Sequence, residues 1–358
     1  MAEQIMIVKN TKNKKMVFSQ NYNYVFDKKT GYFARWGKTK DDDPEFAPTN
    51  EILDLEITTK CSGVTCPDGV ERVCPFCYKA NLPTNTENMS FETFKIIFDK
   101  VNKTNMLTQI AFGADSHATS NPDLWKMMEY CRKNGVIPNI TVAEISDETA
   151  DKLVKYCGAV AVSVYSNRSI AYDSVKRLTD RGMKQVNIHR LVEKNSFKET
   201  MELIDEVKTD ERLAGLNAVV FLSLKQKGRG IHFERVDDNQ FEQIIRKAVD
   251  NKIGFGFDSC TATKFYDVAV KMGLIDKVKD MIEPCESSLF SAYINVKGEF
   301  YPCSFAEGQG SWKTGLSVVD CDDFIKDIWN HKRTIAFRKG LICNRASNGC
   351  RQCPFYRI

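Results

Sequence analysis

From residue 51 to about residue 250, the chain alternates short apolar segments with longer amphipathic ones, and this alternation limits the possible folds more than any other feature. The strand candidates are 52–57, 109–113, 138–142, 160–165, 185–191 and 218–224. The helix candidates are 90–102, 122–134, 146–156, 172–181, 198–208 and 237–250. Regular strand–helix repetition predicts parallel βα units wound right-handedly. A closed eight-unit barrel takes about 250 residues. The shorter segment therefore predicts an α/β fold with a partial (β/α)6 TIM-like barrel, and a seventh strand candidate follows at 253–258.

The segments on either side of this alternation have a different texture. Residues 1–50 contain two strand-like stretches, 15–26 and 32–36, joined by a glycine-containing loop, which predicts a β-hairpin followed by a linker. After about residue 275, short strand candidates and closely placed cysteines replace the helices, with one helix expected near 321–329. The sequence thus predicts three regions: an N-terminal β-hairpin extension and linker (1–50), a partial barrel (51–258) and a small C-terminal domain (259–358).

Cysteine usage indicates where the chemistry lies. The chain has 13 cysteines but only 4 histidines, so a large metal inventory would have to be bound by thiolates. The N-terminus lacks a secretory pattern, and no apolar run approaches the roughly 18 residues of a membrane span. The net charge of +4 is too small to argue for nucleic acid or a membrane surface. We therefore expect a cytoplasmic protein without a membrane partner, in which cysteines serve metal or redox roles more often than disulfides.

The first cysteine group directly follows the first strand candidate. It consists of Cys61, twelve intervening residues and then Cys74-Pro-Phe76-Cys77-Tyr78. Residues after a barrel strand lie at the C-terminal mouth, where barrel active sites assemble. Three thiolates can hold an iron–sulfur cluster and leave one iron open to a substrate. The long gap also carries Cys66, which is the alternative first ligand, and all four cysteines together could form a zinc knuckle.

This segment resembles the signature loop of the radical S-adenosylmethionine (SAM) superfamily. Cys74, Phe76, Cys77 and Tyr78 match its second half, whereas residues 62–73 replace the usual three-residue first gap. The resemblance implies a SAM-binding [4Fe–4S] cluster on Cys61, Cys74 and Cys77. It also implies further cofactor-binding positions, which are Phe76, Tyr78, Gly113, Asp115, Ser163, Asn187, His189 and Leu222. Judged without the resemblance, Gly113 and Asp115 read equally well as an ordinary strand-to-helix turn. A lone polar residue on a strand, such as Ser163, Asn187 or His189, is more often a polar group of the core.

The second cysteine group begins with Cys285, continues through Gly298 to Cys303, and predicts a hairpin that brings these two thiols together. Further cysteines follow at 343, 350 and 353. The pattern resembles the SPASM or twitch extension of radical SAM enzymes, which implies one auxiliary [4Fe–4S] cluster. The expected ligands are Cys285, Cys303, Cys350 and Cys353, with Cys260 and Cys343 as alternatives. Cys260 could instead donate hydrogen to a substrate radical.

The resemblance implies reductive cleavage of SAM to a 5′-deoxyadenosyl radical that abstracts a substrate hydrogen. The expected substrate is a peptide or protein side chain, which is crosslinked or oxidised, and the expected electron donor is flavodoxin- or ferredoxin-like. Modification of a nucleoside or nucleic-acid base is the alternative, and a zinc-stabilised binding module without catalysis is an alternative from another class. Residues 1–50 are shorter and more hairpin-like than the usual leader-peptide recognition domain.

Overall fold

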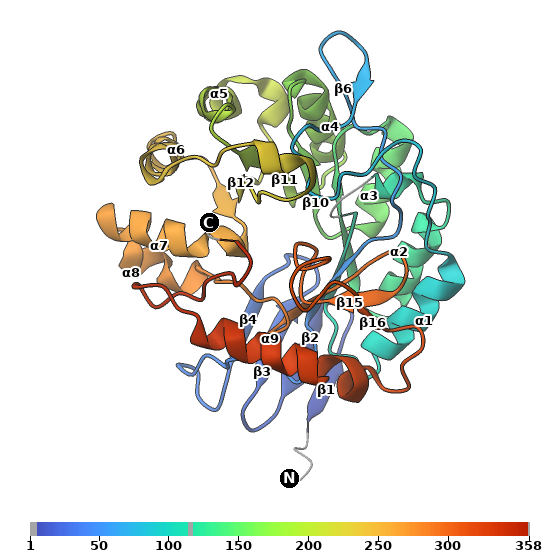
Figure 1. Ribbon diagram of the computed structural model, residues 1–358. Helices are drawn as coiled ribbons and strands as arrows, with labels where there is room; N and C mark the ends of the chain where they lie inside the picture. The colour runs from blue at the N-terminus through green and yellow to red at the C-terminus, as the bar shows by residue number, and fades with distance from the viewer. Residues whose placement is uncertain (1–5, 114–116, 357–358) are drawn as a thin grey trace.

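A ten-stranded sheet dominates the computed structural model, which describes residues 6–113 and 117–356 (Figure 1). Its strands follow the order β13-β12-β11-β10-β9-β8-β5-β14-β15-β16. The pairs from β13 through β14 are parallel, and the last two pairs are antiparallel. The barrel strands are β5 (Ile52–Leu55), β8 (Gln109–Phe112), β9 (Ile137–Val142), β10 (Val160–Ser163), β11 (Val186–Val192), β12 (Ala218–Ser223) and β13 (Phe255–Phe257). All six predicted strands and the seventh candidate are present, which confirms the partial barrel.

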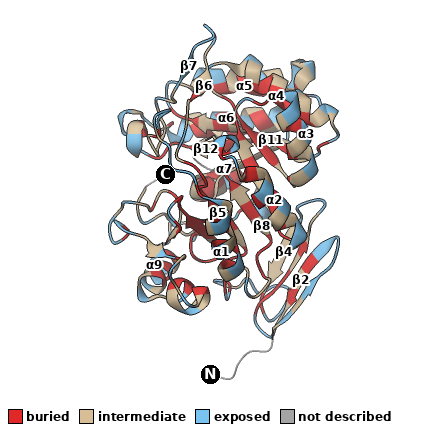
Figure 2. Cartoon of the chain, turned by 90° about the vertical axis from the view of Figure 1, so that its right-hand side faces the viewer, coloured by how far each residue is buried: buried red, intermediate tan, exposed pale blue. Residues whose placement is uncertain are grey.

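Helices form the outer layer of this barrel, and buried residues follow the strands and the inner sides of the helices (Figures 1 and 2). The first six are α1 (Phe91–Val101), α2 (Leu124–Lys133), α3 (Asp147–Tyr156), α4 (Arg168–Asp180), α5 (Phe197–Thr209) and α6 (Asp238–Asp250). Their starts are set locally. Ser90 accepts a hydrogen bond from the amide of Thr93, and Asp237 forms a reciprocal capping box with Gln240. Within the described residues, no helix is long and apolar enough to cross a membrane.

The C-terminal hairpin continues the barrel sheet. Strand β14 (Ser291–Ile294) pairs in parallel with β5, and β15 (Glu299–Tyr301) and β16 (Leu316–Ser317) extend the sheet beyond it. Gly298 adopts a left-handed φ of 77° in the turn between β14 and β15, as the predicted hairpin requires. The first cysteine loop and the C-terminal hairpin therefore leave neighbouring strands of one sheet. We retain the division at residues 258 and 259 as a proposal about folding units.

The N-terminal region forms a four-stranded antiparallel sheet instead of a simple hairpin. Its strands are β1 (Ile7–Asn10), β2 (Lys14–Phe18), β3 (Asn23–Asp27) and β4 (Phe33–Trp36). The single strand predicted over 15–26 is thus wrong, because Ser19 and Tyr22 close a tight turn inside it. Tyr24 and Phe26 of this sheet pack with Leu289 and Phe290 in a second, smaller core.

The C-terminal region contains more helix than the sequence predicts. The π-helix η6 (Phe324–Trp329) matches the expected helix. The additional helices are α7 (Ala262–Lys271), α8 (Ile275–Val278) and α9 (Lys332–Cys343). Helix α9 was missed because its buried side chains include polar Thr334 and Arg338. Arg338 donates to the carbonyls of Ser288 and Trp329, so a buried cation replaces the apolar residue that helical periodicity would show.

Candidate iron–sulfur site

Three cysteines of the loop between β5 and α1 lie close together. Burial, and then the neighbouring Cys77 and Cys61, raise the pKa of the Cys74 thiol to about 12. A hydrogen bond from Tyr165 and the nearby Arg229 act in the opposite direction. Buried thiols that disfavour each other's ionisation become thiolate ligands only when a strongly cationic group binds them. This environment fits an iron–sulfur cluster.

The fourth cysteine of the loop faces elsewhere. The insertion forms a small hairpin of β6 (Val64–Thr65) and β7 (Glu71–Arg72), which projects beyond the barrel in Figure 1. Its Cys66 thiol lies 4.0 Å from the hydroxyl of Ser166 and 3.9 Å from the carbonyl of Val64. The three cysteines that influence one another are therefore Cys61, Cys74 and Cys77.

The loop after β12 packs against the backbone of the cysteine loop. A Cβ atom on Gly228 would lie 2.4 Å from the carbonyl oxygen of Tyr78, and one on Gly230 would lie 2.9 Å from that of Phe76. Between them, Arg229 donates from its amide to Cys77 (3.0 Å) and from Nε to the carbonyl of Cys74 (2.9 Å). Spacing along the chain does not predict this role, because only the tertiary fold shows which backbone the glycine-rich segment touches.

Several expected cofactor positions lie at the C-terminal ends of the strands. Ser163 ends β10 and forms a hydrogen bond with Tyr165, whose ring packs 5.4 Å from that of Phe76. Gly113 follows β8 with a φ of 68°. Leu222 lies near the end of β12, in register with Leu191 of β11.

Two expected cofactor positions, His189 and Asn187, lie at different places along β11. Burial lowers the pKa of His189 to about 4, and Asp258 partly opposes this shift, so His189 is neutral at physiological pH. Asn187 lies at the N-terminal end of the strand and accepts a hydrogen bond from Asn217 at 2.8 Å. The structure therefore does not bring Asn187 to the cysteine loop. Asp115 lies outside the described residues.

A second group of thiols gathers beside the barrel mouth. Burial raises the pKa of Cys260, and Asp258, Cys285 and Cys303 add to the effect, while Lys225 opposes it. The pKa values of Cys285 and Cys303 are raised by burial and by further thiols, among them Cys353 in both cases. The structure thus brings these four cysteines (260, 285, 303 and 353) into one group, with the first from the barrel end and the others from the C-terminal region.

Two other candidate ligands lie apart from this group. Cys350 occupies a turn closed by pairing of Arg345 with Arg351, and the first charged neighbour that affects its pKa is Asp267. Cys343 is exposed at the end of α9. Within the described residues, no set of three or more Cys, His, Asp or Glu side chains is close enough to hold a single metal ion.

Direct contacts connect the two cysteine groups. The ring of Tyr78 lies 4.2 Å from that of Phe305, and its hydroxyl donates to Ser304 at 3.1 Å. Lys227 donates to three carbonyls of the same segment, the nearest being Glu307 at 2.7 Å. The next residue of the cysteine loop, Lys79, pairs with Glu56 and Glu307. The two groups are therefore held in a fixed relation.

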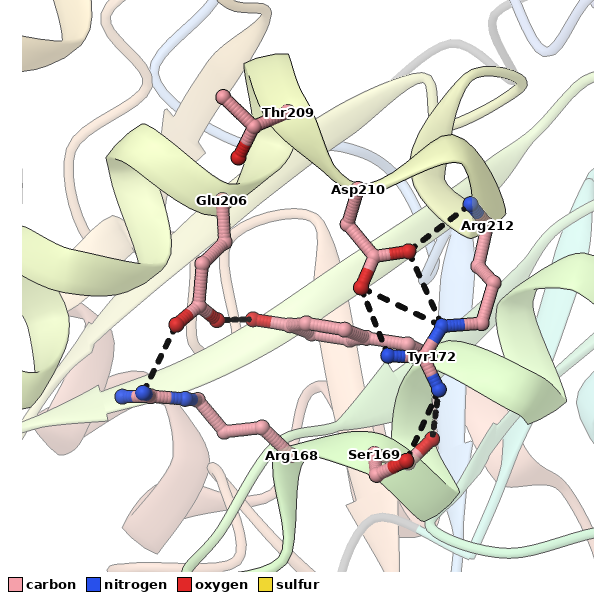
Figure 3. A pocket seen from close by; sticks show the side chains of 7 residues that line it. All are labelled: Arg168, Ser169, Tyr172, Glu206, Thr209, Asp210 and Arg212. Carbon is pink, nitrogen blue, oxygen red and sulfur yellow. Dashed lines mark hydrogen bonds and ion pairs between the residues drawn. The ribbon is translucent and has the colours of Figure 1, made fainter.

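A cavity of about 390 Å³ lies on the outside of the barrel, between α4 and the end of α5 (Figure 3). Its side chains bind one another: Tyr172 donates to Glu206 at 2.5 Å, and Arg212 pairs with Asp210 and Asp173. These mutually satisfied groups come from α4, α5 and the turn that follows, and they form a structural network away from the cysteines.

The C-terminal cysteine group belongs to a recognisable domain. Residues 285–354 match the family described as SPASM, an iron–sulfur cluster-binding domain. This part of the chain is similar to SPASM domains. It contains three of the four grouped thiols, and Cys260 precedes it. No curated protein sequence matches the chain.

Solved structures resemble nearly the whole chain. The structure of Streptococcus suis SuiB bound to precursor peptide SuiA aligns with a TM-score of 0.71 over 96% of this chain and 93% of that one, at 11% identity. SuiB bound to S-adenosylmethionine aligns with a TM-score of 0.64 over 95% and 91%, also at 11% identity. At this identity the likeness establishes the fold. The domain match and the fold shared with these structures agree with the family resemblance, and the match to an iron–sulfur cluster-binding domain favours an iron–sulfur protein over a zinc-stabilised binding module.

Proposed function

We propose that this protein is a radical SAM enzyme that modifies a side chain of a peptide substrate. The observation that carries the proposal is the partly buried group of Cys61, Cys74 and Cys77 at the mouth of a partial barrel. A cluster held by these three thiols has one iron left for SAM. When bound, the cluster and SAM supply one-electron chemistry that starts with removal of a substrate hydrogen. A crosslink or a side-chain oxidation is the proposed outcome.

The residues around the loop would position these groups. Arg229 holds two carbonyls of the cysteine loop and places a positive charge beside thiolates. Tyr165 and Phe76 pack together over the loop and would keep water from it. Neutral His189 could donate or accept one hydrogen bond without adding charge. With Asn187 set aside, Ser163, His189, Leu222, Gly113, Phe76 and Tyr78 remain the proposed SAM contacts.

We propose that Cys260, Cys285, Cys303 and Cys353 hold one auxiliary [4Fe–4S] cluster. All four are buried or partly buried, and their thiols affect one another's ionisation as those of the first group do. The amide of Tyr356 donates to the Cys353 sulfur at 3.4 Å, and the hydroxyl of Ser287 lies 3.4 Å from the sulfur of Cys285. Such hydrogen bonds to sulfur adjust a cluster's reduction potential.

The peptide as substrate is supported by the fold shared with SuiB, which has been crystallised with its precursor peptide. Cys74→Ala tests the enzymatic part. In anaerobically reconstituted protein with a reductant and SAM, this variant should lose 5′-deoxyadenosine formation by at least about a hundredfold, because one of three cluster ligands is missing. Cys66→Ala is the matched control and should retain it. Activity that survives Cys74→Ala but not Cys66→Ala would refute the assignment.

A further inference from the structure

A cavity of about 1000 Å³ lies at the end of the barrel opposite the two cysteine groups. One wall comes from the turns of the N-terminal sheet, and the other comes from the segments that lead from α1, α2 and α3 into the following strands. Five cations line it: Lys12, Lys28, Lys29, Arg132 and Lys133. No lining residue described by the structure is Asp or Glu. The cavity is therefore strongly positive in a chain whose net charge is only +4.

The two inner cations of this cavity bind neutral oxygens. Lys28 donates to the side-chain oxygen of Asn10 and to the carbonyl of Thr11, and Arg132 donates from Nε to the carbonyl of Tyr156. Burial lowers the pKa of Lys28, and Arg132 lowers it further. Like charges are thus held together without a counter-ion between them, which favours an anion that would relieve their repulsion.

Nearby carboxylates are engaged at the edges of the cavity. Glu129 pairs with Lys133 at 3.1 Å on the exposed side of α2. Asp27 accepts hydrogen bonds from the amides of Lys29 and Thr30 in its own turn. Neither of them is among the residues that line the cavity.

Stabilisation of the α2 dipole accounts for only some of the cations that line the cavity. Arg132 and Lys133 occupy the last turn of α2, where cations stabilise the helix dipole. Lys12, Lys28 and Lys29 come from a different element, the N-terminal sheet, which is held against the barrel at this point. Gly135 permits the approach, since a Cβ there would lie 2.6 Å from the Asn10 side chain.

We propose that this cavity binds an acidic segment of the peptide substrate. The inference rests on the proposed function and adds a recognition site to it. The volume is at the upper end of ligand pockets and far exceeds the size of one phosphate, so it can take several side chains. In the described residues, β1 pairs only with β2, and its outer edge leads to Asn10 at the cavity. An extended peptide could add to this edge and place its carboxylates among the cations.

Charge reversal tests the proposal. The variant Lys12→Glu/Lys29→Glu changes two exposed turn side chains, and Lys198→Glu/Lys208→Glu makes the same change of net charge on α5. Fluorescein-labelled hexaglutamate is titrated with each reconstituted holoenzyme at low and high salt, with labelled hexaglutamine as the neutral probe. We expect about tenfold or greater weakening for the first variant only, and binding that weakens as salt rises.

Each other result counts against the site. Equal weakening of hexaglutamate binding in both variants would mean general charge attraction. Binding of hexaglutamine would mean that the cavity does not select acidic side chains. Tripolyphosphate that binds where hexaglutamate does not would replace the peptide with a small anion. Formation of 5′-deoxyadenosine is measured in the same preparations. If it persists while the acidic probe fails to bind, the recognition site is refuted and the proposed enzyme remains. Its absence in the unaltered protein would refute the enzyme instead.

Discussion

At the scale of single residues, burial decides what each cysteine can do. Burial and neighbouring thiols raise the pKa values of Cys74 in the first group and of Cys260, Cys285 and Cys303 in the second. Burial also raises the pKa of Cys131 on α2, where Cys157 is the one other thiol that contributes to the shift. A raised pKa therefore marks a ligand only together with converging sulfurs. Cys260 meets both conditions, which favours a cluster ligand over a hydrogen donor.

Cys260→Ser and Cys350→Ser separate the two possible ligand sets. We expect Cys260→Ser to lose up to about half of the iron and sulfide of the reconstituted protein, because one of two [4Fe–4S] clusters loses a thiolate. Cys350→Ser should keep both clusters. Iron and sulfide analysis with electron paramagnetic resonance of the reduced protein measures this. The reverse outcome would restore the set predicted from the sequence.

At the scale of elements, the segment after β12 acts as a support for the cysteine loop. The short helical turn Gly228–His232 touches the loop backbone directly, and its glycines permit the contact. The segment binds carbonyl groups of the cysteine loop through the amide and the side chain of Arg229. Packing of one loop backbone on another leaves no apolar periodicity and cannot be read from spacing.

Gly228→Ala tests this support. The new methyl group would meet the Tyr78 carbonyl at 2.4 Å, and Gly228 has a φ of 55°. We expect a loss of a few kcal/mol of stability and poor reconstitution of the first cluster, because the left-handed conformation alone costs about 1 kcal/mol. Gly273→Ala has a similar φ of 66° and no atom within 4 Å, so it isolates the conformational cost. Equal melting temperatures and cluster contents in both variants would contradict the role of the contact.

At the scale of the whole molecule, one sheet joins the two cysteine groups, and a second sheet closes the opposite end of the barrel. Strand β14 pairs with β5, so the SPASM domain begins beside the strand that leads into the first cysteine loop. The N-terminal sheet is fixed to the segment before β8, where Lys15 donates to Leu107 and Tyr24 donates to Met106. Chemistry and the proposed peptide recognition thus lie at opposite ends.

The buried Lys15 makes the attachment of the N-terminal sheet depend on pH. Burial, and then Lys28, lower its pKa to about 7 from 10.5. The folded chain therefore binds fewer protons than the unfolded chain between these values, and the free energy of unfolding should rise with pH across this window. The rise is about 1.4 kcal/mol for each pH unit in the middle of the window. Urea titrations under argon at pH 7.5 and 9.5 should show it in the unaltered protein and in Lys14→Met, whose side chain is exposed, but not in Lys15→Met. The same slope in Lys15→Met would contradict this assignment.

The sequence by itself determined what depends on neighbours along the chain. Alternating apolar periodicities specified the seven barrel strands and six helices, and local spacing specified the Cys74–Cys77 pair and the hairpin around Gly298. Only the tertiary structure decided which distant thiols share a group, for example that Cys260 joins Cys285. It also decided that the polar side chain of Arg338 on α9 is buried, where it donates to the carbonyl of Ser288. The reason is physical: strand and helix patterns record which face of an element is buried, whereas the partner that covers this face is chosen by the packing of the whole chain.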